Sequence, residues 1–187
     1  KDPRFWASGI SIVMHMQNPH IPAMHFNTRY ICTTQNWFGG GMDVTPTIKD
    51  NSEKNKFHKT LKTMCERHNK KFYKKYKKWC DEYFYLPHRN ETRGIGGIFF
   101  DYKKDNFEKD FNFVRDVGIT FQMLFNNIIK KKIKKKWTLK DKEMQYIKRG
   151  RYAEFNLLYD RGTKFGLQTG GNIEGILMSL PPIAKWK

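Results

Sequence analysis

Hydrophobic and polar positions alternate along the first part of the chain. Residues 8–16 (SGISIVMHM) alternate as a β-strand does, and residues 23–33 (AMHFNTRYICT) do so again after Pro22. Successive side chains of a strand point to opposite faces of a sheet, so this pattern is typical of half-buried strands. Residues 37–47 (WFGGGMDVTPT) then indicate a short aromatic strand, a glycine triplet and a turn. The N-terminal part therefore predicts antiparallel strands.

From Asn51 onward the apolar spacing changes to that of helices. Two apolar stripes each predict one face of a helix. The first stripe is Phe57, Leu61, Met64 and Cys65, and the second is Phe72, Tyr76, Trp79, Cys80 and Tyr83. Both recur at three to four residues, the spacing of a buried helix face. Residues 106–135 and 140–148 predict a long and a shorter helix.

The remaining segments complete the predicted fold. Residues 93–101 (RGIGGIFFD) have the length and apolar character of a strand, and residues 151–171 suggest two strands around the turn YDRG. Residues 172–182 predict a short helix stopped by proline. Strands, then helices, then strands indicate an α+β fold with a mainly antiparallel sheet. With 187 residues, no internal repeat and no linker, a single domain is expected.

The chain is strongly basic, with 36 Lys and Arg against 18 Asp and Glu and a net charge of +18. Such a charge favours an anionic partner: a nucleic acid, a membrane surface, or a ligand with carboxylates or phosphates. AT-rich codons are an equally good explanation of the lysines. The run at 130–142 (KKKIKKKWTLKDK) contains one aromatic residue, so a solvated helix end is favoured over nucleic-acid binding.

Cysteine content and hydropathy narrow the class further. Cys32, Cys65 and Cys80 show no Cys-x-x-Cys spacing, which predicts reduced thiols in a cytoplasmic protein. No apolar run approaches the roughly 20 residues that a membrane-spanning helix needs, so no membrane insertion is expected.

One strand face carries a row of chemically active side chains. Alternation places His25, Asn27 and Arg29 on one face of the strand at 23–33, with Phe26 on the other. A histidine moves protons near neutral pH, and a guanidinium binds carboxylates in a fork. A solvated polar face is the competing interpretation.

Two further groups are candidates for the same site. Asp43 follows three glycines, where the backbone is open to a flat ligand and the carboxylate could accept ligand N–H groups; an Asx-turn is equally consistent. Arg93 opens a glycine-rich strand that ends at Asp101. His15, His25, His58 and His88 could share a metal, but their spacing gives no support.

Four long blocks of the sequence resemble those of oxygen-dependent coproporphyrinogen III oxidases. The blocks are HMQNPHIPAMHFNTRY, WFGGGMDVTPT, KKWCDEYFYLPHRNETRGIGGIFFD and RGRYAEFNLLYDRGTKFGLQTGGNIEGILMSLPP. The resemblance implies a flat antiparallel sheet with helices on both faces. It implies oxidative decarboxylation of two propionates of coproporphyrinogen III to vinyl groups, giving protoporphyrinogen IX in haem biosynthesis. Dioxygen would be the oxidant, without an organic cofactor, in a homodimer that binds no nucleic acid.

The resemblance also assigns roles by position. It implies His25 as proton donor, Asp43 as the acidic residue that meets the pyrrole N–H groups, and Arg93 as an arginine implicated in activity. The implied substrate contacts are Ser11, Asn27, Thr28, Arg29, Gly170, Gly171 and Asn172. The implied ligands of a divalent metal such as manganese are His15, His25, His58 and His88. Asn172 replaces an arginine usual in the family, which weakens one expected carboxylate contact.

The extent of the match defines the alternative. Residues 1–187 are expected to form one oxidase domain that lacks N-terminal strands and a C-terminal tail of the family. The segment from about Ala153 onward matches a region linked to dimerisation. An inactive fragment that retains only dimerisation or tetrapyrrole binding is therefore the rival interpretation.

Overall fold

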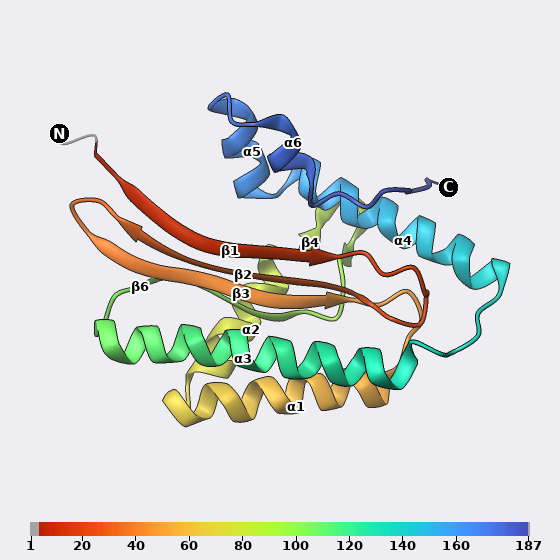
Figure 1. Ribbon diagram of the computed structural model, residues 1–187, viewed down its shortest axis with the longest axis horizontal. Coiled ribbons are helices and arrows are strands. Elements are labelled where there is room, and N and C mark those ends of the chain that lie inside the picture. Colours follow the sequence, from red (N-terminus) through yellow and green to blue (C-terminus); the bar gives the residue numbers. More distant parts are fainter. Residues whose placement is uncertain (1–3, 187) are drawn as a thin grey trace.

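A four-stranded antiparallel sheet forms the centre of the computed structural model, which describes residues 4–186 (Figure 1). The strand order is β1-β2-β3-β6, so the first three strands form a meander and the last adds beside β3. A second, two-stranded sheet pairs β4 with β5. The strands are β1 (Trp6–Met14), β2 (Ala23–Cys32), β3 (Asn36–Thr45), β4 (Tyr85–Leu86), β5 (Glu91–Thr92) and β6 (Gly97–Lys103).

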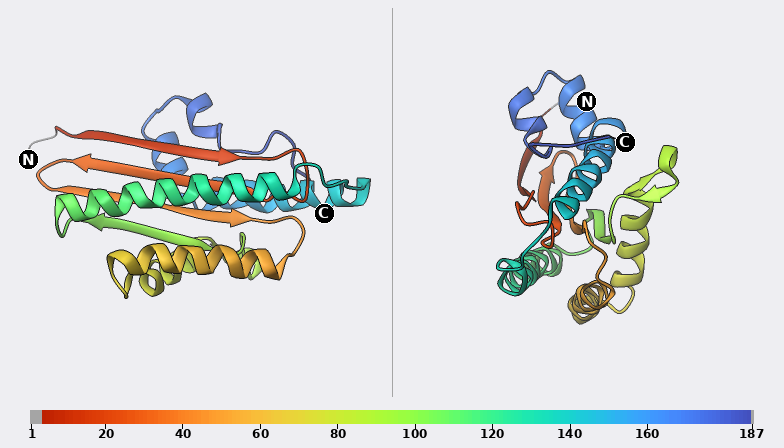
Figure 2. Two further views of the ribbon diagram at one scale, coloured as in Figure 1. Left: turned by 60° about the horizontal axis from the view of Figure 1, so that its bottom comes forward. Right: turned by 90° about the vertical axis from the view of Figure 1, so that its right-hand side faces the viewer.

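Helices pack on both sides of the large sheet. Figures 1 and 2 show α1 and α3 against one face and α4, α5 and α6 on the opposite side, while α2 follows the β6 edge. The α+β fold expected from the sequence is confirmed. The helices are α1 (Asn51–His68), α2 (Phe72–Tyr83), α3 (Phe107–Lys132), α4 (Leu139–Leu158), α5 (Arg161–Gln168) and α6 (Ile173–Leu177), with a 3₁₀ turn at Pro87–Arg89.

The main hydrophobic core lies between the sheet and the layer of α1 and α3. Phe26 of β2 stacks on Phe121 of α3 at 4.8 Å, and Phe100 of β6 meets Phe113 at 5.0 Å. The predicted stripe of α1 is buried in this core. A smaller cluster around Phe84, Phe99 and Phe155 lies on the other face. Both faces of the sheet are therefore packed, and the second face leaves room for a site.

The prediction of two strands at 151–171 is wrong, because helix α4 continues to Leu158 and α5 follows at once. Every residue from Tyr152 to Asn156 is buried, so this part of the chain does not show the alternating burial of a half-buried strand. Asp160 in the YDRG turn is the N-cap of α5, and its side chain accepts the backbone N–H of Thr163. The turn thus joins two helices.

Two other segments differ in detail from the sequence interpretation. The glycine triplet does not end a strand: β3 runs through it for ten residues, and Gly41 packs under the backbone of Ile98 on β6. Conversely, β6 begins only at Gly97, because Gly96 has a left-handed φ of +77° that breaks the strand. Arg93 therefore lies before β6 and does not share its face with Asp101.

A β-bulge interrupts the pairing of β3 with β6. Phe38 pairs with Lys103 and Gly40 with Phe100, so two residues, Asp101 and Tyr102, lie opposite Gly39 alone. Tyr102 has a left-handed φ of +52°, which is costly for a bulky residue. The bulge shifts the alternation by one position, and Lys103 reaches Asp110 of α3 at 2.6 Å on the core side.

The remaining sequence predictions concern thiols and membranes. All three cysteines are free, and Cys65 and Cys80 are buried. Among the described residues no helix combines the length and the apolar character needed to cross a bilayer.

Candidate active site

Strand β2 presents its polar row to the face away from the main core. His25, Asn27 and Arg29 all line a cavity on this face, whereas Phe26 packs against α3. The predicted division of the strand into two faces is thus confirmed. Strand alternation predicts the row, but the sequence alone does not predict the cavity.

His25 is paired with a buried carboxylate on the neighbouring strand. The register sets His25 directly opposite Asp43, and the imidazole Nδ1 lies 2.7 Å from Asp43 Oδ1. The Asp43 side chain is 3% exposed, against 17% for His25. A carboxylate that fixes one imidazole nitrogen leaves the other to exchange a proton with a ligand.

Arg93 completes the buried charges. Its guanidinium donates to Asp43 Oδ2 at 2.5 Å and to Asn156 Oδ1 at 3.2 Å. The rings of Phe84, Tyr152 and Phe155 surround it at 4.0, 4.3 and 4.8 Å. Because a buried charge needs partners, this cage and carboxylate account for an arginine side chain that is only 2% exposed.

These contacts set the protonation states of the pair. Burial alone would raise the pKa of Asp43, but the Arg93 charge and the hydrogen bond with His25 outweigh it and lower that pKa. Burial likewise opposes the charge of Arg93, yet Asp43 holds its pKa above the usual value. At neutral pH the site therefore contains a carboxylate and a guanidinium.

The polar row continues along β2 away from Asp43. The amide nitrogen of Asn27 lies 3.2 Å from His25 Nε2, and Arg29 donates to Asn27 Oδ1 at 3.2 Å. Arg29 also reaches over β3 to Asp101 on β6, at 2.7 Å. Both nitrogens of the imidazole consequently have polar neighbours.

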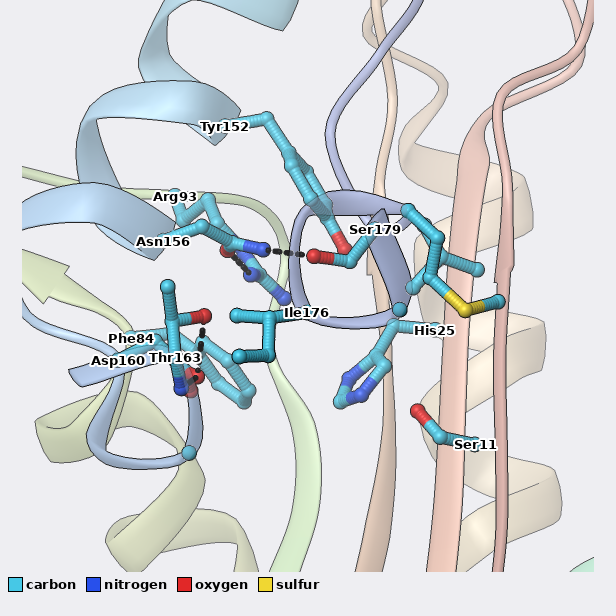
Figure 3. Close-up of a pocket in the computed structure, with 14 residues that line it drawn as sticks. Ser11, His25, Phe84, Arg93, Tyr152, Asn156, Asp160, Thr163, Ile176 and Ser179 are labelled. Atoms are coloured by element: carbon cyan, nitrogen blue, oxygen red, sulfur yellow. Dashed lines mark hydrogen bonds between the residues drawn. The ribbon is translucent and has the colours of Figure 1, made fainter. Parts of the chain in front are cut away.

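Two adjoining cavities meet at His25. The first has a volume of about 250 Å³ and the second about 550 Å³, and both touch His25, Ser11 and Phe84. Figure 3 shows His25 and Ser11 on the sheet facing Phe84, Asp160 and Thr163 across the first cavity. Arg29 and Arg161 line the second cavity. The space suits a bulky ligand with anionic substituents.

The other three histidines lie in separate environments. His15 contacts the Ser179 carbonyl, His58 contacts the Ile95 carbonyl, and His88 contacts Glu154. The described part of the chain holds no cluster of three or more His, Cys, Asp or Glu side chains suited to a metal. The four histidines that the resemblance assigns to a metal therefore do not fit one shared site.

The remaining expected substrate contacts are divided. Ser11 touches both cavities, and Thr28 lines the second. Gly170 and Gly171 lie in the turn between α5 and α6, where Gly170 has a left-handed φ of +71°. Asn172 is the N-cap of α6 and accepts the N–H of Gly175. The neighbouring Gly175 and Ile176 line the first cavity.

Several site residues were not identified from the sequence. Asn156, Tyr152 and Phe84 surround Arg93, and Asp101 binds Arg29. Phe84 lies just beyond a helical stripe, and Tyr152 and Asn156 lie in a segment that was predicted as strands, so no pattern in the sequence indicated that these residues surround an arginine. Asp101 ends an apolar run, and its alternation with Phe99 was a signal that pointed to this face.

An aspartate-bound histidine between two cavities, beside cavity-lining arginines, is an arrangement typical of enzymes that use acid–base catalysis on an anionic substrate. Comparison with known families makes this specific: the model of the coproporphyrinogen III oxidase family matches residues 1–187, and the chain belongs to that family.

Curated relatives agree with this assignment. The oxygen-dependent coproporphyrinogen-III oxidase of Rickettsia bellii (strain OSU 85-389) is 57% identical over 186 residues, which are 99% of this chain and 67% of the relative. The enzymes of the same name from Rickettsia rickettsii (strain Sheila Smith) and Rickettsia akari (strain Hartford) are each 56% identical with the same coverage. The chain spans about two thirds of the length of these relatives.

Proposed function

We propose that this chain oxidatively decarboxylates two propionate groups of coproporphyrinogen III to vinyl groups, giving protoporphyrinogen IX. Each conversion releases one CO₂, one proton and two electrons, and dioxygen accepts the electrons. The observation that carries the proposal is the His25–Asp43 pair at the junction of the two cavities. The oxygen-dependent oxidases at 56–57% identity support the substrate and the oxidant.

His25 is the group that moves the proton. Its ring is 17% exposed, lines both cavities and is held by a carboxylate that stays ionised at neutral pH. Arg29 is the better candidate to meet a substrate carboxylate, because its side chain is 30% exposed, whereas Arg93 is caged. Arg93 then contributes by holding Asp43.

Asp43 has a role that differs from the one expected by resemblance. Both of its oxygens are already engaged, one with His25 and one with Arg93, and the side chain is 3% exposed. These contacts favour an action through His25 over a direct hydrogen bond to a pyrrole N–H. Ser11 and Thr28, which both line the second cavity, then remain as neutral contacts for the substrate.

Assembly, location and domain extent belong to the same proposal. Exposed apolar side chains gather in the segment from α4 to the end of the described chain, among them Leu157, Phe165, Ile173, Met178 and Trp186. Such a surface supports a homodimer, which sedimentation equilibrium would measure. The three free thiols support a cytoplasmic location, which cell fractionation would test. That residues 1–187 form a single domain stays a prediction.

Turnover of coproporphyrinogen III tests the function. We expect protoporphyrinogen IX and CO₂ to form under air and not under argon. His25→Ala should lower kcat by about 100-fold or more, the usual value of a positioned acid or base. His20→Ala is the matched control, since His20 contacts the Lys136 carbonyl outside both cavities and should leave kcat within about twofold.

Other outcomes would assign the chain differently. Substrate binding without turnover would support the rival view of a remnant that only binds tetrapyrroles. Unchanged turnover in His25→Ala would refute the proposed role of the histidine. Assays with a chelator test separately whether a divalent metal takes part.

A further inference from the structure

Six polar side chains form one continuous hydrogen-bonded row across the site. The row links three strands of the sheet and the loop before β6. Its members, in order of contact, are Arg93, Asp43, His25, Asn27, Arg29 and Asp101. Only the first five were expected from the sequence to contribute to the site.

Arg29 fixes the direction of the hydrogen bonds that join it to Asn27 and Asn27 to His25. A guanidinium can only donate, so the Asn27 atom that faces Arg29 must be the carbonyl oxygen. The amide NH₂ of Asn27 then faces His25 Nε2, which must accept. The neutral imidazole consequently carries its proton on Nδ1, and this N–H donates to Asp43. The Asp43 carboxylate imposes this tautomer from the Nδ1 side, and Arg29 supports it from the Nε2 side by orienting Asn27.

Asp101 holds Arg29 in the position from which its guanidinium donates to Asn27. Its Oδ2 binds Arg29 at 2.7 Å, while its Oδ1 accepts the backbone N–H of Tyr102 at 3.0 Å. The carboxylate is thus anchored within the bulge by the backbone of the next residue. A bulge of this kind re-aims a side chain, here toward β2.

Gly39 leaves the space in which the two charges meet. It lies on β3 between Arg29 and Asp101, and a Cβ there would come within 2.5 Å of Asp101 Oδ1 and 2.8 Å of Arg29 Cζ. The missing side chain therefore lets Arg29 cross the strand. Bulge, glycine and ion pair together make one feature.

We propose that Asp101 is a positioning residue for the histidine: through Arg29 it holds the Asn27 amide with its NH₂ on His25 Nε2, and so keeps unprotonated the nitrogen that faces the cavity side of the row. This inference rests on the proposed function for its catalytic meaning, but the tautomer itself is a property of the unliganded protein. The tautomer decides which nitrogen exchanges a proton.

Imidazole ¹⁵N NMR of the full chain without substrate is the first test. The wild type should show His25 with a protonated Nδ1 and an unprotonated Nε2. Asp101→Ala should leave Nδ1 protonated, because the Asp43 carboxylate still accepts from it, but should shift the Nε2 resonance, because Asn27 is no longer held with its NH₂ on that nitrogen. Asp101→Asn should retain most of the wild-type signal, because an amide oxygen can still accept from Arg29. Asp105→Ala is the matched control, because it removes an aspartate that lies just after β6 and is 83% exposed.

Kinetics separate positioning from simple binding. We expect Asp101→Ala to lower kcat by about 10- to 100-fold, as for other residues that orient a reacting group, with KM changed by less than about threefold. Gly39→Ala should act in the same direction, because its methyl group displaces the ion pair without removing a charge.

Asn27→Asp gives the converse test. An acceptor beside Nε2 should protonate that nitrogen and change the ¹⁵N signature whatever happens to turnover. An unchanged His25 Nε2 resonance in folded Asp101→Ala and Gly39→Ala would overturn the proposal. An altered Nε2 resonance in a protein that never turns over coproporphyrinogen III would instead reject the proposed function and leave the positioning role intact.

Discussion

Asp43 is a charged side chain almost wholly removed from water, and its stability depends on two partners. Arg93 supplies the opposite charge and His25 an N–H donor, so the carboxylate has a partner at each oxygen. Removing one member of such a pair leaves the other buried and unpaired, which costs more than the pair itself contributes.

We therefore predict that Asp43→Ala lowers the free energy of unfolding by about 3–5 kcal/mol. The double variant Asp43→Ala/Arg93→Met should recover part of this loss, because a thioether suits the cage of Phe84, Tyr152 and Phe155. Urea unfolding followed by circular dichroism measures both. If the double variant is less stable than Asp43→Ala alone, then the unpaired charge of Arg93 is not what destabilises the single variant.

Residue-level prediction from the sequence was accurate where strand alternation applied. It placed His25, Asn27 and Arg29 on one face, and the pairing of β2 with β3 then brought Asp43 beside them. Alternation could not identify Asp101 as the partner of Arg29, because that contact depends on a glycine in the neighbouring strand β3 and on a bulge in β6 beyond it.

Helix α4 shows how an element can differ from its sequence interpretation. Its second half is rich in aromatic and β-compatible residues, which suggested a strand, but the side chains of Tyr152, Phe155 and Asn156 must meet Arg93 from one helix face. Tertiary packing overrides such local preferences. The helices at α1, α2 and α3 were predictable because their stripes are long and regular.

The start of α4 is fixed by a capping box. Thr138 accepts the N–H of Asp141, and the Asp141 carboxylate accepts the N–H of Thr138. Thr138→Ala should lower the free energy of unfolding by about 1 kcal/mol, the usual cost of losing an N-cap. Thr60→Ala within α1 is the control, since its hydroxyl only bonds the Lys56 carbonyl one turn back. Equal effects of both substitutions in thermal unfolding would show that the box is unimportant.

Charge at the scale of the whole molecule makes stability depend on pH. Burial lowers the pKa of both His15 and His58 below the ordinary value of 6.5. The unfolded chain therefore binds protons at these residues more readily than the folded one. In addition, hydrogen bonds from Arg89 and His88 lower the pKa of Glu154 to about 2 from 4.5.

We expect stability to be constant above pH 6.5 as far as these groups are concerned and to fall in two stages below it. The histidines contribute as the pH drops through 6.5, and Glu154 and Asp43 contribute from about pH 4.5 downward. Urea midpoints measured across this range check the order. His58→Gln should flatten the first stage, and stability that rises on acidification from pH 7 to 5 would contradict it.

Because β6 comes late in the chain, the candidate site is complete only when this strand has joined the sheet. The meander of β1 to β3 is local, and of the six residues of the row it supplies His25, Asn27, Arg29 and Asp43. Arg93 lies fifty residues beyond Asp43, and Asp101 arrives only with β6. A partly folded chain without β6 has the histidine and its carboxylate in water, with neither guanidinium contact fixed. Such a chain lacks the ordered row, so we expect proton transfer at His25 to require a sheet in which β6 is already paired with β3.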